Sequence, residues 1–180
     1  VLALQAGAGL GLLSIGMLLV SATIGVNSLI CWIMVVSLAV LFWRDTWLWF
    51  SGWKSLAQIW DASGRFGKAL GSGFCIILLY SLIIALAPPI KFDALVYHLA
   101  LPKLYLNNGG FKYIPEIMFW GMPQVGEMLY TLGMGLAGHT GAVLVGWWVG
   151  VIALFGVLGF TVDRFGINPG WVAATSLISG

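Results

Sequence analysis

Residues 69–98 read ALGSGFCIILLYSLIIALAPPIKFDALVYH, and this stretch decides the fold class of the chain. Its apolar part carries no formal charge and is long enough to cross a hydrocarbon core of about 30 Å as a helix. It closes on Pro88 and Pro89, and Lys91 and Asp93 follow at once. A carboxylate costs little at the membrane boundary and far more one turn deeper. The stretch therefore predicts a membrane-spanning helix that ends in a charged segment.

The composition of the whole chain is that of a membrane protein. Hydrophobic residues make up 61% and charged residues 8% of the 180 residues, against about 25% charged in a typical soluble domain. We therefore expect an all-α fold, a polytopic transmembrane bundle that forms the N-terminal part of one transmembrane domain. The expected spans, the last one truncated, are residues 3–20, 24–43, 69–89, 140–160 and 171–180.

Basic residues in the loops predict the orientation of the chain. Loops 44–68 and 161–170 lie on one side in this topology and hold five lysines and arginines, whereas segment 91–139 holds three. Because cytoplasmic loops carry the excess of positive charge, we expect loop 44–68 in the cytoplasm and segment 91–139 outside it, in a multi-pass protein of the cytoplasmic (inner) membrane. Aromatic residues recur at helical spacing in loop 44–68, which favours an interfacial amphipathic helix over a plain connector.

Several other readings find little support in the sequence. The net charge is only +2 and the basic residues do not cluster, so we expect no nucleic-acid partner. Cys31 and Cys75 lie inside apolar spans without metal-ligand spacing. Three glycine pairs match the small-xxx-small pattern that lets helices approach closely; they are residues 7 and 11, 67 and 71, and 146 and 150.

The external segment holds most of the remaining polar chemistry. Asp93 is well placed to cap a helix running over residues 94–106, and Pro102 should kink that helix because it lacks an N–H donor. The run Asn107-Asn108-Gly109-Gly110 should end it. Polar side chains alternate with leucines along this helix. It is therefore expected to lie along the membrane surface.

Helical geometry ranks the partners of Asp93. At 100° per residue, Tyr97 lies about 40° from Asp93, while His98 lies about 140° away and would need the cap or the kink to bring it round. Residues 111–124 are expected to be irregular. A second helical run should start at Gln124 with Glu127 in its first turn, where an acid suits the helix dipole, and His139 should end it just before the next span.

Each polar residue also has a purely structural interpretation. Asp93 fits a helix cap, Glu127 a first-turn charge, and His98 and His139 fit packed or boundary histidines. The lysines of the segment suit contacts with lipid phosphates in any membrane protein; they are Lys91, Lys103 and Lys112. The acidic and histidine side chains of this side match no compact metal motif. We therefore expect no cofactor, and a divalent metal is left open.

Two stretches of the external segment resemble a known enzyme family. Residues 92–105 (FDALVYHLALPKLY) and 123–130 (PQVGEMLY) resemble the start of bacterial GT-C glycosyltransferases, which are related to the protein O-mannosyltransferases and the lipid A aminoarabinose transferases. The match covers roughly residues 88–160, with an Asp-x-x-x-Tyr-His-x-x-x-Pro core. Here Phe92 precedes and Ala94 follows Asp93, instead of the acidic pair of some relatives. This departure weakens any carry-over of metal dependence.

The resemblance implies a membrane glycosyltransferase. Such an enzyme moves a sugar from a polyprenyl-phosphate carrier to an acceptor glycan, lipid or protein outside the cytoplasm. In an inverting displacement, Asp93 would be the general base, and Lys91 or Lys103 would stabilise the leaving phosphate. The resemblance assigns substrate binding to Tyr97 and His98, and we add Glu127 to them. The 180 residues alone are expected to be inactive.

Two other classes of function compete with the enzyme. A transporter subunit would need polar or ionisable groups facing a cavity in mid-membrane, and the spans offer only Asn27 and scattered serines and threonines. A non-catalytic membrane scaffold is neither required nor excluded by the external segment.

Overall fold

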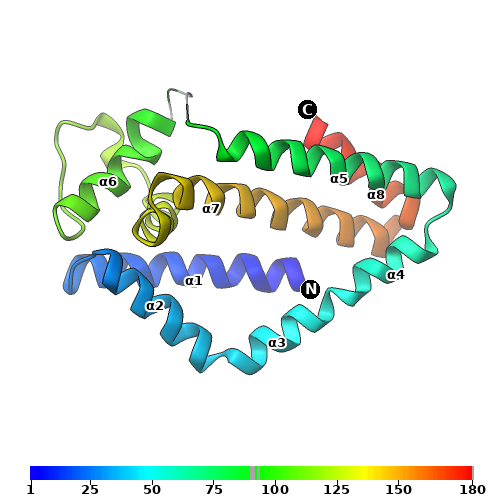
Figure 1. Ribbon diagram of the computed structural model, residues 1–180, viewed down its shortest axis with the longest axis horizontal. Coiled ribbons are helices and arrows are strands. Elements are labelled where there is room, and N and C mark those ends of the chain that lie inside the picture. Colours follow the sequence, from blue (N-terminus) through cyan, green and yellow to red (C-terminus); the bar gives the residue numbers. More distant parts are fainter. Residues whose placement is uncertain (90–91, 93, 180) are drawn as a thin grey trace. The chain divides into compact units, whose positions relative to one another are not determined.

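The computed structural model describes residues 1–89, 92 and 94–179. Within those residues, the regular secondary structure consists of helices alone (Figure 1). This finding agrees with the all-α prediction. Lys91 and Asp93 lie outside the described residues, so the cap and the base predicted for Asp93 stay predictions.

The chain divides into two compact units, which are described separately. The first combines Val1–Gly7 and Phe42–Ile84 with the residues from Trp148 onward, and the second combines Ala8–Leu41 with Ala85–Trp147. Helix α1 (Leu2–Thr23) therefore contributes to both units, as does α7 (Val125–Phe165). The candidate site lies in the second unit.

The first unit is built around an aromatic core. It contains α3 (Trp43–Gly52), α4 (Lys54–Ala62), α5 (Arg65–Leu86) and α8 (Ile167–Ser179). Phe74 on α5 and Trp171 on α8 are almost fully buried with Leu158 and Ala174. The indole Nε1 of Trp171 donates to Ser63 Oγ at 3.0 Å, so the buried ring has a partner for its polar edge.

Close helix packing in the first unit depends on two of the predicted glycines. A Cβ added at Gly67 would come within 3.0 Å of Asn168 Oδ1, and one at Gly71 within 2.9 Å of the Trp60 ring. Both glycines are buried. Gly7 and Gly11, by contrast, have no neighbour within 4 Å at the Cβ position. The small-xxx-small pattern thus marks a close approach at 67 and 71 but not at 7 and 11.

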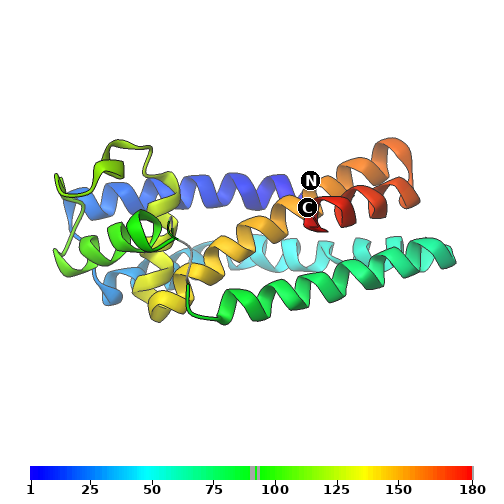
Figure 2. The same ribbon diagram turned by 90° about the horizontal axis from the view of Figure 1, so that it is seen from above.

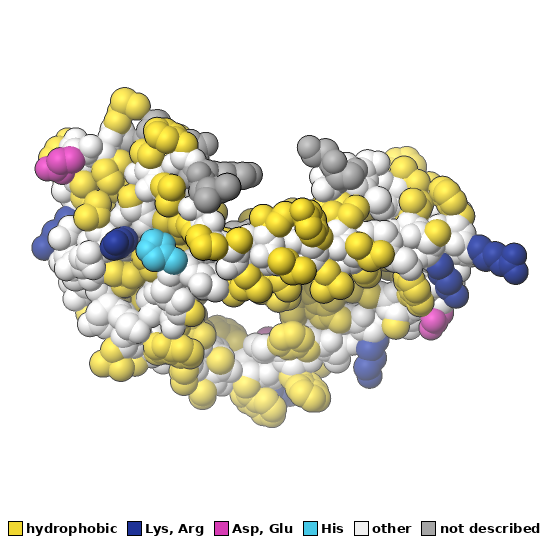
Figure 3. All heavy atoms as spheres, turned by 45° about the horizontal axis from the view of Figure 1, so that its top comes forward, with side chains coloured by type: hydrophobic (Ala, Val, Ile, Leu, Met, Phe, Trp, Pro, Cys, Tyr) yellow, Lys and Arg dark blue, Asp and Glu magenta, His cyan; other side chains and the backbone are white. Residues whose placement is uncertain are grey.

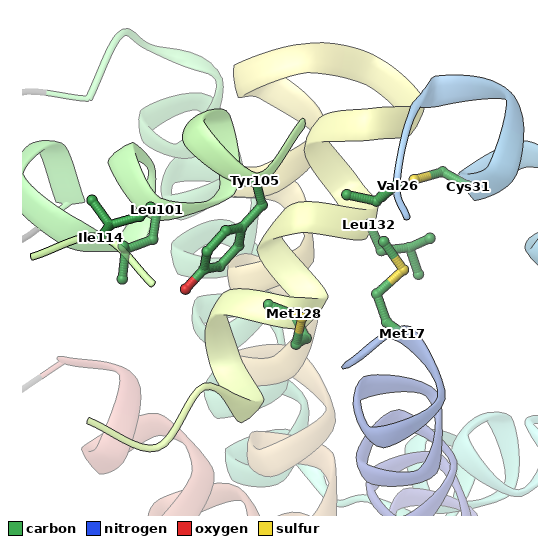
Figure 4. Close-up of a cluster of buried hydrophobic side chains, with 8 residues drawn as sticks. All are labelled: Met17, Val26, Cys31, Leu101, Tyr105, Ile114, Met128 and Leu132. Atoms are coloured by element: carbon green, nitrogen blue, oxygen red, sulfur yellow. The ribbon is translucent and has the colours of Figure 1, made fainter. Parts of the chain in front are cut away.

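The second unit packs residues 94–124 against the first two helices of the chain. It contains α2 (Ser28–Leu41), the π-helix η1 (Ala94–His98), α6 (Ala100–Asn107) and the 3-10 helix η2 (Met118–Gly121). Figures 1 and 2 both show α6 beside the ends of α1 and α2. Figure 4 shows the buried side chains between these elements. They are Met17, Val26, Cys31, Leu101, Tyr105, Ile114, Met128 and Leu132.

Backbone hydrogen bonds join residues 109–111 to the hairpin between α1 and α2. The N–H of Val26 donates to the carbonyl of Gly109 at 3.0 Å, and the N–H of Phe111 donates to the carbonyl of Ser21 at 3.0 Å. Gly109 has φ +69°, a conformation that favours glycine. The predicted end of the external helix over residues 107–110 is confirmed, since α6 ends at Asn107.

The helix predicted over residues 94–106 breaks at a different place from the one predicted. The chain forms η1 up to His98, turns at Leu99 and begins α6 at Ala100, so the predicted kink at Pro102 is wrong. Pro102 is the third residue of α6. Proline is tolerated there because a first-turn N–H has no partner within the helix.

Helix α7 consists of two helical parts joined at a sharp break. Ala137 (φ −145°) and Gly138 (φ +64°, ψ −155°) leave the helical region, close to the predicted boundary before His139. Gly133 and Gly141 meet across this break, because a Cβ added at Gly133 would come within 2.6 Å of the Gly141 carbonyl oxygen. The two parts therefore cross with their backbones almost in contact.

The described residues contain three helices that are long and apolar enough to cross a membrane: α1, α5 and α7. The count rises to four if α2 and the α3–α4 segment, bent by 76°, are one broken span. Most side chains of these helices are not buried by the chain itself. Figure 3 shows hydrophobic side chains over much of the visible surface, with few charged ones among them. These features are typical of a membrane protein.

Candidate functional site

A histidine and a buried carboxylate from the two stretches are hydrogen-bonded in the second unit. His98 Nδ1 lies 3.0 Å from Glu127 Oε1, although the residues are 29 positions apart. The Glu127 side chain is only 8% exposed, whereas that of His98 is 37% exposed. A buried carboxylate is costly unless it is hydrogen-bonded. The pair therefore satisfies Glu127 and leaves part of the imidazole open.

Glu127 is held by the first turn of α7. Its own carbonyl accepts a hydrogen bond from Thr131 Oγ1 at 2.6 Å, and Ser14 on α1 donates to the carbonyl of Val125 at 2.5 Å. The next residue, Met128, is fully buried in the core of the unit. The backbone that carries the Glu127 side chain is therefore held in place by these hydrogen bonds and by the packing of Met128.

His98 is positioned by the end of the π-helix and by its buried neighbour. Leu99 is 3% exposed and packs with Met134 and Ala142 from the two parts of α7. A π-helix closes i→i+5 hydrogen bonds, so an angle based on 100° per residue does not apply over residues 94–98. The predicted angle of about 140° between Asp93 and His98 assumed an α-helix over these residues.

Two tyrosine rings lie against the imidazole. The ring centroid of Tyr97 is 4.0 Å from that of His98 at an interplanar angle of 47°, and that of Tyr130 is 5.6 Å away at 63°. Tyr130 in turn rests on Gly146, where an added Cβ would come within 3.0 Å of the Tyr130 hydroxyl. The predicted site did not include Tyr130, although its i+3 spacing from Glu127 places both on one helix face.

The hydrogen bond assigns the proton of the neutral imidazole. An ionised carboxylate can only accept, so Nδ1 carries the hydrogen and donates it to Glu127. The other ring nitrogen, Nε2, then presents a lone pair. The His98 side chain is 37% exposed, so solvent or a ligand can reach the imidazole. The site therefore offers a hydrogen-bond acceptor between two phenol rings.

A second polar network orders the irregular segment before α7. Tyr105 is fully buried, and its hydroxyl donates to Gln124 Oε1 at 3.0 Å. Gln124 Nε2 donates to the carbonyls of Trp120 at 2.8 Å and Met122 at 3.0 Å. Burial raises the pKa of Tyr105 to about 12. Tyr105 therefore serves as a neutral structural group that places the start of α7.

Lys103, the other predicted site residue that the structure describes, is not part of this cluster. Lys103 is exposed on α6, and among the described residues no hydrogen bond joins it to His98 or Glu127. The described residues also contain no group of three or more histidine, cysteine or acidic side chains that could hold a metal. Asp93 and Lys91 fall outside the described residues.

Comparison with known proteins identified no relative of this chain: no family model, no curated protein and no solved structure matches it.

Proposed function

We propose that this protein is a membrane glycosyltransferase that moves a sugar from a polyprenyl-phosphate carrier to an acceptor on the extracytoplasmic side of the inner membrane. The observation that carries the proposal is the contact between His98 and Glu127 at 3.0 Å. It joins the two stretches on which the resemblance rests, residues 92–105 and 123–130. Residues that resemble one enzyme family in two separate places thus meet at one polar site.

The proposed chemistry is an inverting displacement at the anomeric carbon of the sugar. Asp93 takes the proton of the acceptor hydroxyl, whose oxygen attacks the face opposite the phosphate. The bond between the anomeric carbon and the phosphate oxygen breaks, and polyprenyl phosphate leaves as an anion that Lys91 or Lys103 stabilises. In the sequence, Asp93 directly precedes the π-helix that carries Tyr97 and His98.

The proposed topology places this chemistry at the membrane surface. The charged segment 91–139 follows the span that ends near Pro89, so its polar groups would lie at the level of lipid headgroups, where a carrier phosphate also lies. We propose five spans, with segment 91–139 outside the cytoplasm and loop 44–68 inside. Cysteine accessibility to a membrane-impermeant reagent, at residues introduced in each loop, tests this orientation.

A transfer assay tests the proposed function. Membranes containing the full-length protein are incubated with a panel of radiolabelled polyprenyl-phosphate sugars, and wild type is compared with Asp93→Asn at matched expression. Glu116→Gln is the control, because Glu116 is an exposed acid of the same segment. We expect transfer by wild type and Glu116→Gln and none by Asp93→Asn. Full activity of Asp93→Asn would remove Asp93 from the chemistry, and no transfer by wild type across the panel would contradict the proposed function.

A transporter subunit is the second candidate, and one observation favours it. The break at Ala137 and Gly138 interrupts α7, and transporters commonly bind substrates at broken helices. Uptake of a labelled sugar by vesicles that contain the protein, without formation of a glycosylated product, would support this candidate over the enzyme.

A further inference from the structure

We infer that His98 Nε2 accepts a hydrogen bond from a carbohydrate hydroxyl group of the substrate, and that Glu127 is the positioning residue that holds His98 in this role. The inference rests on the proposed function, because that function supplies a sugar at the site. It assigns to the pair a specificity for one hydroxyl group, in addition to the base role proposed for Asp93.

The first argument is the protonation of the ring. Glu127 Oε1 lies 3.0 Å from His98 Nδ1, and in a neutral imidazole that donates from Nδ1 the other ring nitrogen, Nε2, has no hydrogen. A nitrogen of this kind accepts hydrogen bonds from hydroxyl groups and repels other acceptors. The ligand group that fits Nε2 is therefore a hydroxyl, the most abundant donor of a sugar.

The second argument is the orientation of the ring. Glu127 is buried on a helix turn that the core holds in place, and the rings of Tyr97 and Tyr130 contact the imidazole. Rotation of His98 about its side chain would break the bond to Glu127 and disturb both aromatic contacts. A preorganised acceptor needs no rearrangement on binding, which increases its contribution to specificity.

The third argument is access. The His98 side chain is 37% exposed while that of Glu127 is 8% exposed, so a ligand can reach the imidazole but not the carboxylate. His98 is thus placed to contact the ligand, and Glu127 is placed to hold His98.

The experiment combines one substitution with substrates that lack single hydroxyl groups. The full-length protein is assayed with the donor sugar and acceptor that wild type uses, and then with each monodeoxy analogue of the donor and, in a second arm, of the acceptor. His98→Asn is the test variant, because the asparagine amide can donate to Glu127 from near the Nδ1 position but leaves nothing at Nε2. His139→Asn is the matched control, since His139 is exposed and lies outside the cluster.

We expect wild type and His139→Asn to lose about tenfold in kcat/KM on one particular deoxy analogue, the size of one lost neutral hydrogen bond. His98→Asn should lose a similar factor on the complete substrate and nothing further on that analogue. In that case the effects of removing the imidazole and of removing the hydroxyl group do not add. If this happens with a donor analogue, His98 contacts the donor sugar; if it happens with an acceptor analogue, His98 contacts the acceptor. Because each ratio compares two substrates on the same protein sample, it does not depend on how much of the variant folds.

The role of Glu127 is tested by the same measurement, the ratio of kcat/KM on the complete substrate to kcat/KM on the deoxy analogue. Glu127→Gln keeps a carbonyl oxygen that can accept from Nδ1 and should retain most of the deoxy discrimination, whereas Glu127→Leu should abolish it. If His98→Asn discriminates against every deoxy analogue as wild type does, the inference is overturned while the transfer reaction stands. If wild type transfers no sugar, the proposed function fails first, and the inference falls with it.

Discussion

The crossing of the two parts of α7 allows a quantitative prediction for Gly133→Ala. The added Cβ would come within 2.6 Å of the Gly141 carbonyl oxygen and 2.8 Å of Val145 Cγ2. The first of these neighbours is backbone and cannot rotate away. Overpacking of this kind typically costs about 1–3 kcal/mol, and we therefore expect the free energy of unfolding to be lower by that amount than in a control that gains an alanine without a clash.

Gly126→Ala is the matched control for this substitution. Gly126 is also in α7, and a Cβ there has no neighbour within 4 Å. Alanine in a helix gains about 0.5–1 kcal/mol over glycine, and both variants receive this gain. The difference between them therefore isolates the steric effect at the crossing. It corresponds to a Tm difference of about 2–4 °C for each kcal/mol in a chain of this size.

The assay uses the buried thiol of the second unit as its reporter. Cys31 is buried and Cys75 is exposed, so a Cys75→Ser background leaves one thiol that reacts with a fluorogenic maleimide only when the second unit opens. Thermal melts of the purified protein in detergent give Tm for each variant. A Gly133→Ala protein that melts with or above Gly126→Ala would refute the close crossing of the two parts.

Three further predictions concern the cap of α2, the support of the site and the response to alkaline pH. Asn27→Ala removes the side-chain acceptor at 2.9 Å from the Ile30 N–H and should cost about 1 kcal/mol, read as a lower Tm in the thiol assay. Gly146→Ala should press on the Tyr130 hydroxyl, 3.0 Å from the added Cβ, and reduce transfer with little loss of Tm, whereas equal activity would contradict the support given to the site. The pKa of Tyr105 is raised from 10.0 to about 12 in the folded protein. The neutral phenol therefore contributes its full stabilisation below pH 10, and this contribution is lost as pH rises from 10 to 12. Tm should fall over that pH range, and the fall should be smaller in Tyr105→Phe.

Local signals in the sequence predicted the ends of several elements. The run Asn107-Asn108-Gly109-Gly110 stops α6 because Gly109 takes a positive φ that other residues avoid. The first-turn position of Glu127 followed from the chain pattern and agrees with the start of α7 at Val125. Features of this kind depend on a few neighbouring residues, and one sequence is sufficient to locate them.

The pairing of His98 with Glu127 could not be obtained in the same way. The sequence ranked Tyr97 above His98 only as a partner of Asp93, from an α-helical angle, and it made no prediction of a contact between His98 and Glu127. The partner of His98 lies 29 residues away and depends on the packing of Leu99 against both parts of α7. A contact that tertiary packing creates has no local pattern by which to find it.

The number of membrane spans also could not be predicted from local sequence signals alone. Length and hydropathy identify α1, α5 and α7, but α2 is only 14 residues long and continues into a segment bent by 76°. The residues expected to form one span at 24–43 therefore include a hairpin, a short helix and the start of a bend. Composition measures how apolar a segment is and does not report where its axis turns.

The hydrogen bonds that tie residues 21–26 to residues 109–111 have a consequence for the order of biosynthesis. Helices α1 and α2 leave the ribosome before segment 91–139, and chains fold largely from the N-terminus as they are made. We therefore expect the Ser21 carbonyl and the Val26 N–H to be available when residues 109–111 emerge. The hairpin between α1 and α2 would then supply hydrogen-bond partners to residues 109–111 as these residues fold. A chain without the hairpin would fold this segment without those partners.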